Sequence, residues 1–411
     1  MSGDSSIFRM DERFVEQLRD RLLNAKKYYF GSDSGPTLVA AESVPSAEQI
    51  EELILALHGA STQREEGRLS QPSVMFAEPL PLNYMALVFA SPKRLSVEEV
   101  RKIAPAVAPP DGQIGVWPSG EDGVLHIWGL QTTDLMRVLF KIIDPGRVVV
   151  SHLGFQIAEI TGQRAGFISR AWDRRALELM STLGADGTMA GEMLSYLSIY
   201  ATQEILRRVR LLGHGGTIIF VPPGRRWERS VEPVFYACEL RLSEMERIAK
   251  ALEGELREAG EGKPAGEGLR HTILHKGVEL IGSHQYKAFV GAAARRITHL
   301  STVDGATILS ENFEVLAFGA KLKAPRRGAK AATVTRFIPL EGTSDGAEVP
   351  LDQEFRGTRH LSAAQFVFNN PGAIAFVVSQ DGGITGLFMG EEEGEEPQQK
   401  LIAFKGLELV L

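Results

Sequence analysis

Val303-Asp304-Gly305-Ala306 and Gly357-Thr358-Arg359-His360 are the two stretches that decide how the second half of this 411-residue chain is interpreted. Asp304 stands where a strand or turn ends, and Gly305 would let a ligand approach the backbone closely. Arg359 stands just before a helix-compatible stretch, residues 362–366. A helix N-terminus presents backbone N–H groups that favour phosphate. A phosphorylated ligand bound at this helix start is therefore one interpretation of the second stretch.

The elements around these stretches follow a definite order. A helix rich in Leu and Arg, residues 193–212, leads through Gly213-His214-Gly215-Gly216 into the apolar strand 217–221. The Asp-Gly-Ala strand follows, and then the run 317–322. After the Gly-Thr-Arg-His turn and its helix comes the strand 374–379.

These motifs and their order resemble the catalytic domain of the diadenylate cyclase (DAC) family, over roughly the second half of the chain. The resemblance implies an α/β domain with a mixed central sheet flanked by helices in residues 191–411. It also implies the condensation of two ATP molecules into the bacterial second messenger cyclic di-AMP, with release of pyrophosphate. Mg²⁺ or Mn²⁺ is the implied cofactor. Because two ATP-loaded sites must face each other, a homodimer or higher even oligomer is implied as well.

The resemblance also assigns roles to individual residues. The implied catalytic residues are Asp304, Gly305 and Ala306, with Asp304 as the metal ligand and a possible base. The implied nucleotide- and phosphate-binding residues are Leu322, Gly357, Thr358, Arg359, His360 and Ser379.

Three of these assignments have structural alternatives. Leu322 matches the position that packs on adenine and Ser379 one at the nucleotide pocket, but the two would equally suit a core and a strand end. Arg359, taken alone, would equally suit an ion pair with an acidic neighbour such as Asp352 or Glu354. The Asp-Gly-Ala motif upstream favours the phosphate interpretation.

The chain departs from the family pattern at several positions. Leu361 stands where the family usually has a second Arg, and this removes one phosphate-facing cation. Val303 replaces a His found in many members, and Gln380-Asp381 replaces two acidic residues found in some. A catalytically degenerate nucleotide-binding sensor or interaction protein on the same fold is therefore the alternative function. A second Asp-Gly-Ala, at 345–347, lies in a Gly- and Ser-rich stretch and is interpreted as a turn.

The first half of the chain predicts a separate α+β domain, residues 1–190, and the resemblance implies a sensor or regulatory role for it. Residues 11–30 have the period of an amphipathic helix. Ser46 with Gln49, and Ser96 with Glu99, have the spacing of helix caps. Strands are expected at 73–76, 85–89, 115–117, 125–128 and 148–150. A Gly-containing break at 184–187 places the boundary near residue 190.

Composition narrows the possible partners. The net charge of -7 offers no basic surface for nucleic acid. One cysteine, Cys238, excludes an internal disulfide and suits a reducing compartment. No stretch is long and apolar enough for a membrane span. A cytoplasmic, ATP-binding protein without nucleic-acid or membrane partners is expected.

Overall fold

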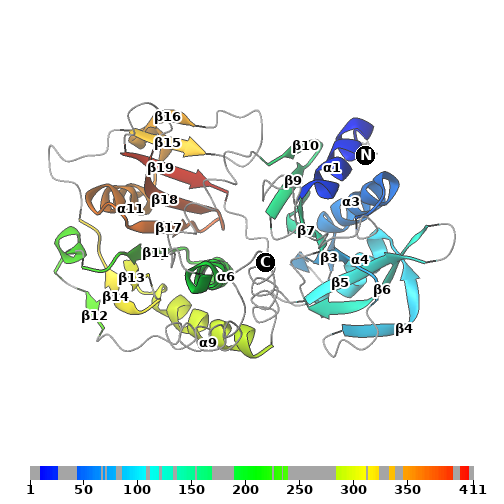
Figure 1. Ribbon diagram of the computed structural model, residues 1–411, viewed down its shortest axis with the longest axis horizontal. Coiled ribbons are helices and arrows are strands. Elements are labelled where there is room, and N and C mark those ends of the chain that lie inside the picture. Colours follow the sequence, from blue (N-terminus) through cyan, green and yellow to red (C-terminus); the bar gives the residue numbers. More distant parts are fainter. Residues whose placement is uncertain are drawn as a thin grey trace, which may run out of the picture. The chain divides into compact units, whose positions relative to one another are not determined.

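The structure is a computed structural model, and its described residues fall in two compact units, one within residues 1–169 and one within residues 170–409 (Figure 1). The described residues are 10–25, 44–65, 68–69, 72–79, 86–107, 112–119, 123–132, 137–152, 155–168, 189–224, 226–233, 235–238, 284–311, 313–323, 333–337, 346–391 and 399–406.

The N-terminal unit places helices on one face of an eight-stranded sheet. Its helices are α1 (Glu12–Leu23), α3 (Ala47–Ser61) and α4 (Val97–Ile103), followed by the 3₁₀ turn η2 (Ala104–Ala106). The sheet has the order β10-β9-β8-β7-β3-β5-β6-β4. Its strands are β3 (Ser73–Phe76), β4 (Ala86–Arg94), β5 (Gly112–Pro118), β6 (Leu125–Thr132), β7 (Val138–Asp144), β8 (Arg147–His152), β9 (Phe155–Thr161) and β10 (Arg164–Phe167). A small separate hairpin joins β1 (Arg64–Glu65) and β2 (Arg68–Leu69).

Both predicted helix caps of this unit are confirmed. Ser46 and Gln49 form a reciprocal capping box at the start of α3. The Ser96 hydroxyl accepts a hydrogen bond from the Glu99 N–H at the start of α4, 3.2 Å away. The helix predicted over 11–30 is α1, and residues 26–30 lie outside the described residues.

The five predicted strands are present, although residue 85 lies outside the described residues; β1, β2, β7, β9 and β10 were not predicted. β7 and β8 form a hairpin around Asp144-Pro145-Gly146, where Gly146 has a positive φ of 71°. That turn sequence between two apolar runs is a hairpin signal that could have revealed β7.

The C-terminal unit is built on a nine-stranded mixed sheet with the order β12-β14-β13-β11-β17-β18-β19-β15-β16. Its strands are β11 (Gly216–Val221), β12 (Tyr236–Ala237), β13 (Ala306–Ser310), β14 (Val315–Ala320), β15 (Thr333–Phe337), β16 (Ala347–Pro350), β17 (Ile374–Val378), β18 (Ile384–Glu391) and β19 (Gln399–Lys405). Its helices are α6 (Met189–Leu211), α9 (His284–Leu300), α10 (Leu351–Glu354) and α11 (Thr358–Asn369), with the 3₁₀ turn η3 (Trp227–Ser230).

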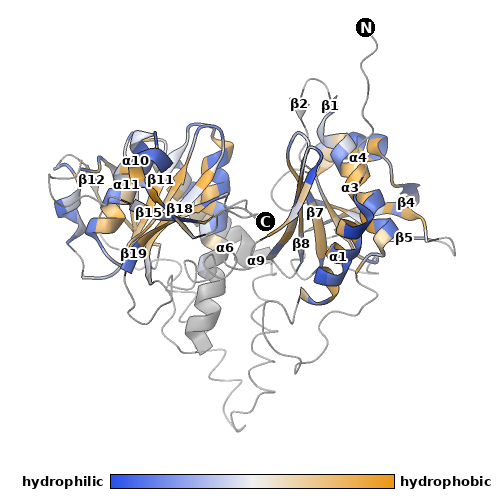
Figure 2. Cartoon of the chain, turned by 90° about the horizontal axis from the view of Figure 1, so that it is seen from above, coloured by the Kyte–Doolittle hydropathy of each residue, from blue (hydrophilic) through white to orange (hydrophobic). Residues whose placement is uncertain are grey.

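Helices cover both faces of this sheet (Figure 1). Ile219 and Val221 of β11 share a core with Ala363, Ala364 and other residues of α11. On the opposite face, Val209 of α6 lies against Gly216, at the start of β11. Central strands enclosed in this way are predominantly apolar, and Figure 2 shows hydrophobic colouring concentrated in the strands of each sheet.

The chain is α+β overall, as the sequence predicts. Residue 190, the predicted domain boundary, lies in the first turn of α6, and that boundary stays a prediction. Among the described helices, none joins enough length to enough apolar character to cross a lipid bilayer.

Candidate functional site

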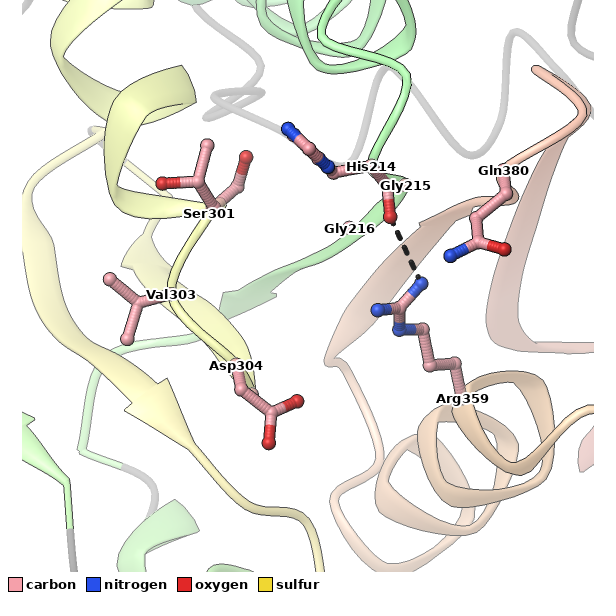
Figure 3. Close-up of a pocket in the computed structure, with 10 residues that line it drawn as sticks. His214, Gly215, Gly216, Ser301, Val303, Asp304, Arg359 and Gln380 are labelled. Carbon is pink, nitrogen blue, oxygen red and sulfur yellow. Dashed lines mark hydrogen bonds between the residues drawn. The ribbon is translucent and has the colours of Figure 1, made fainter.

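A pocket of about 270 Å³ opens where three neighbouring strands of the C-terminal sheet have their ends. β11 pairs in parallel with β13 and antiparallel with β17, so Thr217 lies opposite Ala306 and Gly216 lies opposite Val378. The starts of β11 and β13 and the end of β17 therefore meet at one edge. The lining residues are His214, Gly215, Gly216, Ser301, Thr302, Val303, Asp304, Gly305, Arg359 and Gln380 (Figure 3).

Asp304 reaches this pocket from the loop between α9 and β13. Strand β13 begins only at Ala306, so the carboxylate precedes the strand. Asp304 is exposed, and it is the one acidic residue among the described residues that line the pocket. An exposed carboxylate in this position is free to bind a cation.

Gly305, directly after Asp304, stands at a position with no room for a side chain. Its φ is 121°, and a Cβ atom there would lie 2.5 Å from the carbonyl carbon of Gly319 in β14. Gly319 also has a positive φ, 64°. The Asp304 loop and β14 therefore touch backbone to backbone.

Arg359 enters from the opposite wall, in the first turn of α11 (Figure 3). Its Nη1 donates a hydrogen bond to the carbonyl oxygen of His214 over 3.3 Å. Gly215 makes room for this contact, since a Cβ atom there would lie 2.7 Å from the Val378 oxygen and 3.0 Å from Arg359 Nη1. The alternative partner Glu354 instead contacts Arg336, at 3.2 Å, and Lys405.

The pocket thus carries one carboxylate and one guanidinium on facing walls. No cluster of three or more His, Cys, Asp or Glu side chains suited to a metal occurs within the described ranges. Mg²⁺ is commonly held by one or two carboxylates, with phosphate oxygens and water completing its octahedron. Asp304 alone therefore fits a metal that arrives with a phosphorylated ligand.

His360 does not line the pocket. Its ring stacks on Phe355, with centroids 5.1 Å apart and an interplanar angle of 17°. Burial, and secondly the nearby positive charge of Lys405, lower the pKa of His360, and Asp381 opposes them. In this position His360 packs on Phe355 outside the pocket.

Ser379 forms part of the turn between β17 and β18. Its hydroxyl donates to the Asp381 carboxylate, and its N–H donates to the Gly383 oxygen over 2.9 Å. The Ser379 hydroxyl and, less strongly, the Gly383 N–H lower the pKa of Asp381. This turn holds Gln380 at the pocket.

The other sequence-assigned residues lie around the pocket rather than in its lining. Leu322 pairs with Val231 in an isolated bridge and packs against the core. Ala306 is buried. Gly357 is the N-cap residue of α11, and Thr358 is its exposed first residue.

Several lining residues were not assigned from the sequence: His214, Gly215, Gly216, Ser301, Thr302, Val303 and Gln380. Gly213 and Gly215 both have positive φ, 69° and 66°, in the turn between α6 and β11. The Gly-His-Gly-Gly sequence directly before an apolar strand is a signal that could have placed this turn at a ligand site.

Comparison with known families gives a match in the N-terminal part of the chain. Residues 40–132 match a family model described as "Probable sensor domain DACNV", so this N-terminal segment resembles a sensor domain. No curated protein matches the chain.

Proposed function

We propose that the chain is a diadenylate cyclase, which condenses two ATP molecules into cyclic di-AMP, and that its N-terminal unit regulates it. The observation that carries this proposal is the convergence of Asp304 and Arg359 on one pocket, from two motifs 55 positions apart in the sequence. The match to a probable sensor domain, of a kind associated with diadenylate cyclases, supports the regulatory role.

The reaction requires position and charge neutralisation more than covalent chemistry. The 3′-hydroxyl of one ATP attacks the α-phosphorus of the other, so a phosphodiester bond forms while the bond to pyrophosphate breaks. In a second, equivalent step, the 3′-hydroxyl of the second nucleotide attacks the α-phosphorus of the first. This step closes the ring and releases a second pyrophosphate. A base must accept each hydroxyl proton.

Each wall of the pocket suits part of this task. Asp304 would bind Mg²⁺ or Mn²⁺, which neutralises phosphate charge and lowers the pKa of the attacking hydroxyl. The Arg359 guanidinium suits phosphate oxygens, which it can contact through two N–H groups at once. The first N–H groups of α11 have no partner within the helix and can bind anions.

Each subunit would supply one ATP, so two pockets must face each other in a homodimer or higher even oligomer. The N-terminal unit would then control the rate by changing how two catalytic units meet.

A nucleotide-binding sensor without catalytic activity is the second candidate. Leu361, which replaces a cation of the family motif, is half-buried and packs against the core of the C-terminal unit. A phosphate contact that assists turnover would then be missing, while the pocket itself remains.

Incubation of the purified full-length chain with ATP and Mn²⁺, followed by chromatography and mass spectrometry, tests the proposal. Cyclic di-AMP and pyrophosphate in a molar ratio of one to two are expected from the balanced reaction. Calorimetric ATP binding without product would favour the sensor. Absence of both binding and product would eliminate both functions.

A further inference from the structure

A solvent-exposed aromatic pair lies beside the Asp304 loop. Tyr236 of β12 is 62% exposed, although it is a large apolar side chain. Its ring stacks on Phe318 of β14, with centroids 4.8 Å apart and an interplanar angle of 17°. The stack fixes the orientation of the Tyr236 ring and leaves one of its surfaces open to solvent.

Two glycines bring this pair against the pocket. A Cβ atom on Gly319 would lie 3.2 Å from Val303 Cγ1 and 3.3 Å from Tyr236 Cδ2. Gly319 in turn lies against Gly305, next to Asp304. Val303 is 37% exposed and lines the pocket. An apolar surface formed by Tyr236, Gly319 and Val303 therefore continues from the pocket wall.

The size of the pocket indicates that part of a nucleotide ligand lies outside it. Cavities that enclose a drug-sized ligand usually measure about 300–1,000 Å³. The pocket, at about 270 Å³, has room for only part of a nucleoside triphosphate. If the phosphates lie between Asp304 and Arg359, the base must lie on a neighbouring surface.

We propose that Tyr236 is a further ligand-binding residue whose exposed ring stacks on the nucleobase of the bound nucleotide. This inference rests on the proposed function. A planar π-system is the chemistry that an oriented aromatic face recognises, and each such stack strengthens binding by about tenfold or more. A second copy of the chain is a poorer occupant, because stable protein interfaces bury about 800 Å² on each partner and this surface comprises three residues.

The test measures the contribution of the base to binding affinity separately from that of the phosphates. Calorimetry on the full-length chain with Mg²⁺ compares a non-reactive ATP analogue, methylene-bridged between the α- and β-phosphates, with inorganic tripolyphosphate, which has no base. The variants are Tyr236→Ala, Tyr236→Phe, which keeps the ring, and Tyr236→Leu, which keeps apolar bulk. Leu211→Ala is the matched control, since Leu211 is also 62% exposed and lies in the same unit.

Tyr236→Ala and Tyr236→Leu should weaken analogue binding by about tenfold. Tripolyphosphate binding should stay unchanged, and Tyr236→Phe and Leu211→Ala should bind both ligands as the wild type does. Equal analogue affinity in all variants would overturn the inference alone. An equal loss for both ligands would show a general structural effect, and a change in oligomeric state would assign the surface to a second copy; either result overturns it. A wild type that binds neither ligand would overturn the proposed function as well.

Discussion

The Arg359 guanidinium is hydrogen-bonded to the His214 carbonyl oxygen, although 145 positions separate the two residues. The contact ties the first turn of α11 to the turn that begins β11. It also holds the guanidinium at the pocket before any ligand binds, which reduces the side-chain entropy lost on binding.

Replacement of Arg359 by Ala should therefore weaken ATP binding more than it weakens the fold. A charge-assisted contact to phosphate contributes about 1.5–3 kcal/mol, so the dissociation constant should rise by about ten- to a hundredfold. Calorimetry with ATP, alongside thermal unfolding, measures both quantities. Arg356→Ala, also exposed and three residues earlier, is the control. Unchanged ATP affinity in Arg359→Ala would exclude a phosphate role.

Asp304→Asn should lower product formation by at least about a hundredfold and leave the unfolding temperature unchanged. The substitution keeps the size of the side chain but removes the charge that binds the cation. Asp345→Asn supplies a matched control, because Asp345 begins the second Asp-Gly-Ala of the chain and lies outside the described residues. Equal turnover in the two variants would contradict the assignment of the site.

The substitutions Gly305→Ala and Gly346→Ala compare how tightly the backbone is packed at the two Asp-Gly-Ala motifs. Both glycines have positive φ, but only at Gly305 would a Cβ atom collide with backbone; at Gly346 nothing lies within 4 Å. Gly346→Ala should cost about 1 kcal/mol and Gly305→Ala about 2 kcal/mol or more in the free energy of unfolding. Denaturant titration measures both. Similar costs would mean that the contact between Gly305 and Gly319 is not tight.

Leu361→Arg should destabilise the C-terminal unit by about 1–2 kcal/mol, because a half-buried apolar contact is replaced by a charge. Leu361→Met keeps the contact and should be neutral. Urea unfolding measures stability, and the cyclase assay follows in parallel. A rise in activity without loss of stability would show that the position accepts the family's cation.

The free energy of unfolding should depend on pH through His360. Its pKa is lowered in the folded state below the ordinary value of about 6.5, so the unfolded chain binds the proton more readily. The stabilisation from neutral His360 is present above about pH 6.5 and is lost as pH falls through the lowered pKa. His360→Phe should keep the stack on Phe355 and reduce this pH dependence. Urea titrations at about pH 7.5 and about pH 5.5 compare the two proteins. An identical pH dependence would show that His360 does not contribute.

Local sequence patterns predict many of the helices and strands of the molecule. The Ser46 and Gln49 capping box needs only the spacing of two side chains and the local backbone. The strand 217–221 is buried at every position and apolar from Ile218 to Val221 because helices cover both of its faces, and it is found as β11. Such elements depend on neighbours close in sequence or on burial alone.

The candidate site is less predictable, because it is made by contacts distant in sequence. Asp304 and Arg359 were expected together from a family resemblance, and both line the pocket. His360 belongs to the same tetrapeptide as Arg359 but turns toward Phe355, since a helix directs successive side chains to different sides. Gln380 reaches the pocket through the pairing of β17 with β11. The local sequence around Gln380 does not predict this pairing.

The position of β11 between β13 and β17 has a consequence for hydrogen exchange. Its backbone amides are paired on both sides, and Ile218, Ile219, Phe220 and Val221 are buried. Amides of this kind exchange with deuterium mainly when the whole domain unfolds. Strand β11, whose first residue Gly216 lines the pocket, should therefore be among the slowest-exchanging parts of the C-terminal unit. A regulatory signal of the kind proposed above would therefore act on the loop and helix walls that carry Asp304 and Arg359, because β11 opens only with loss of the fold.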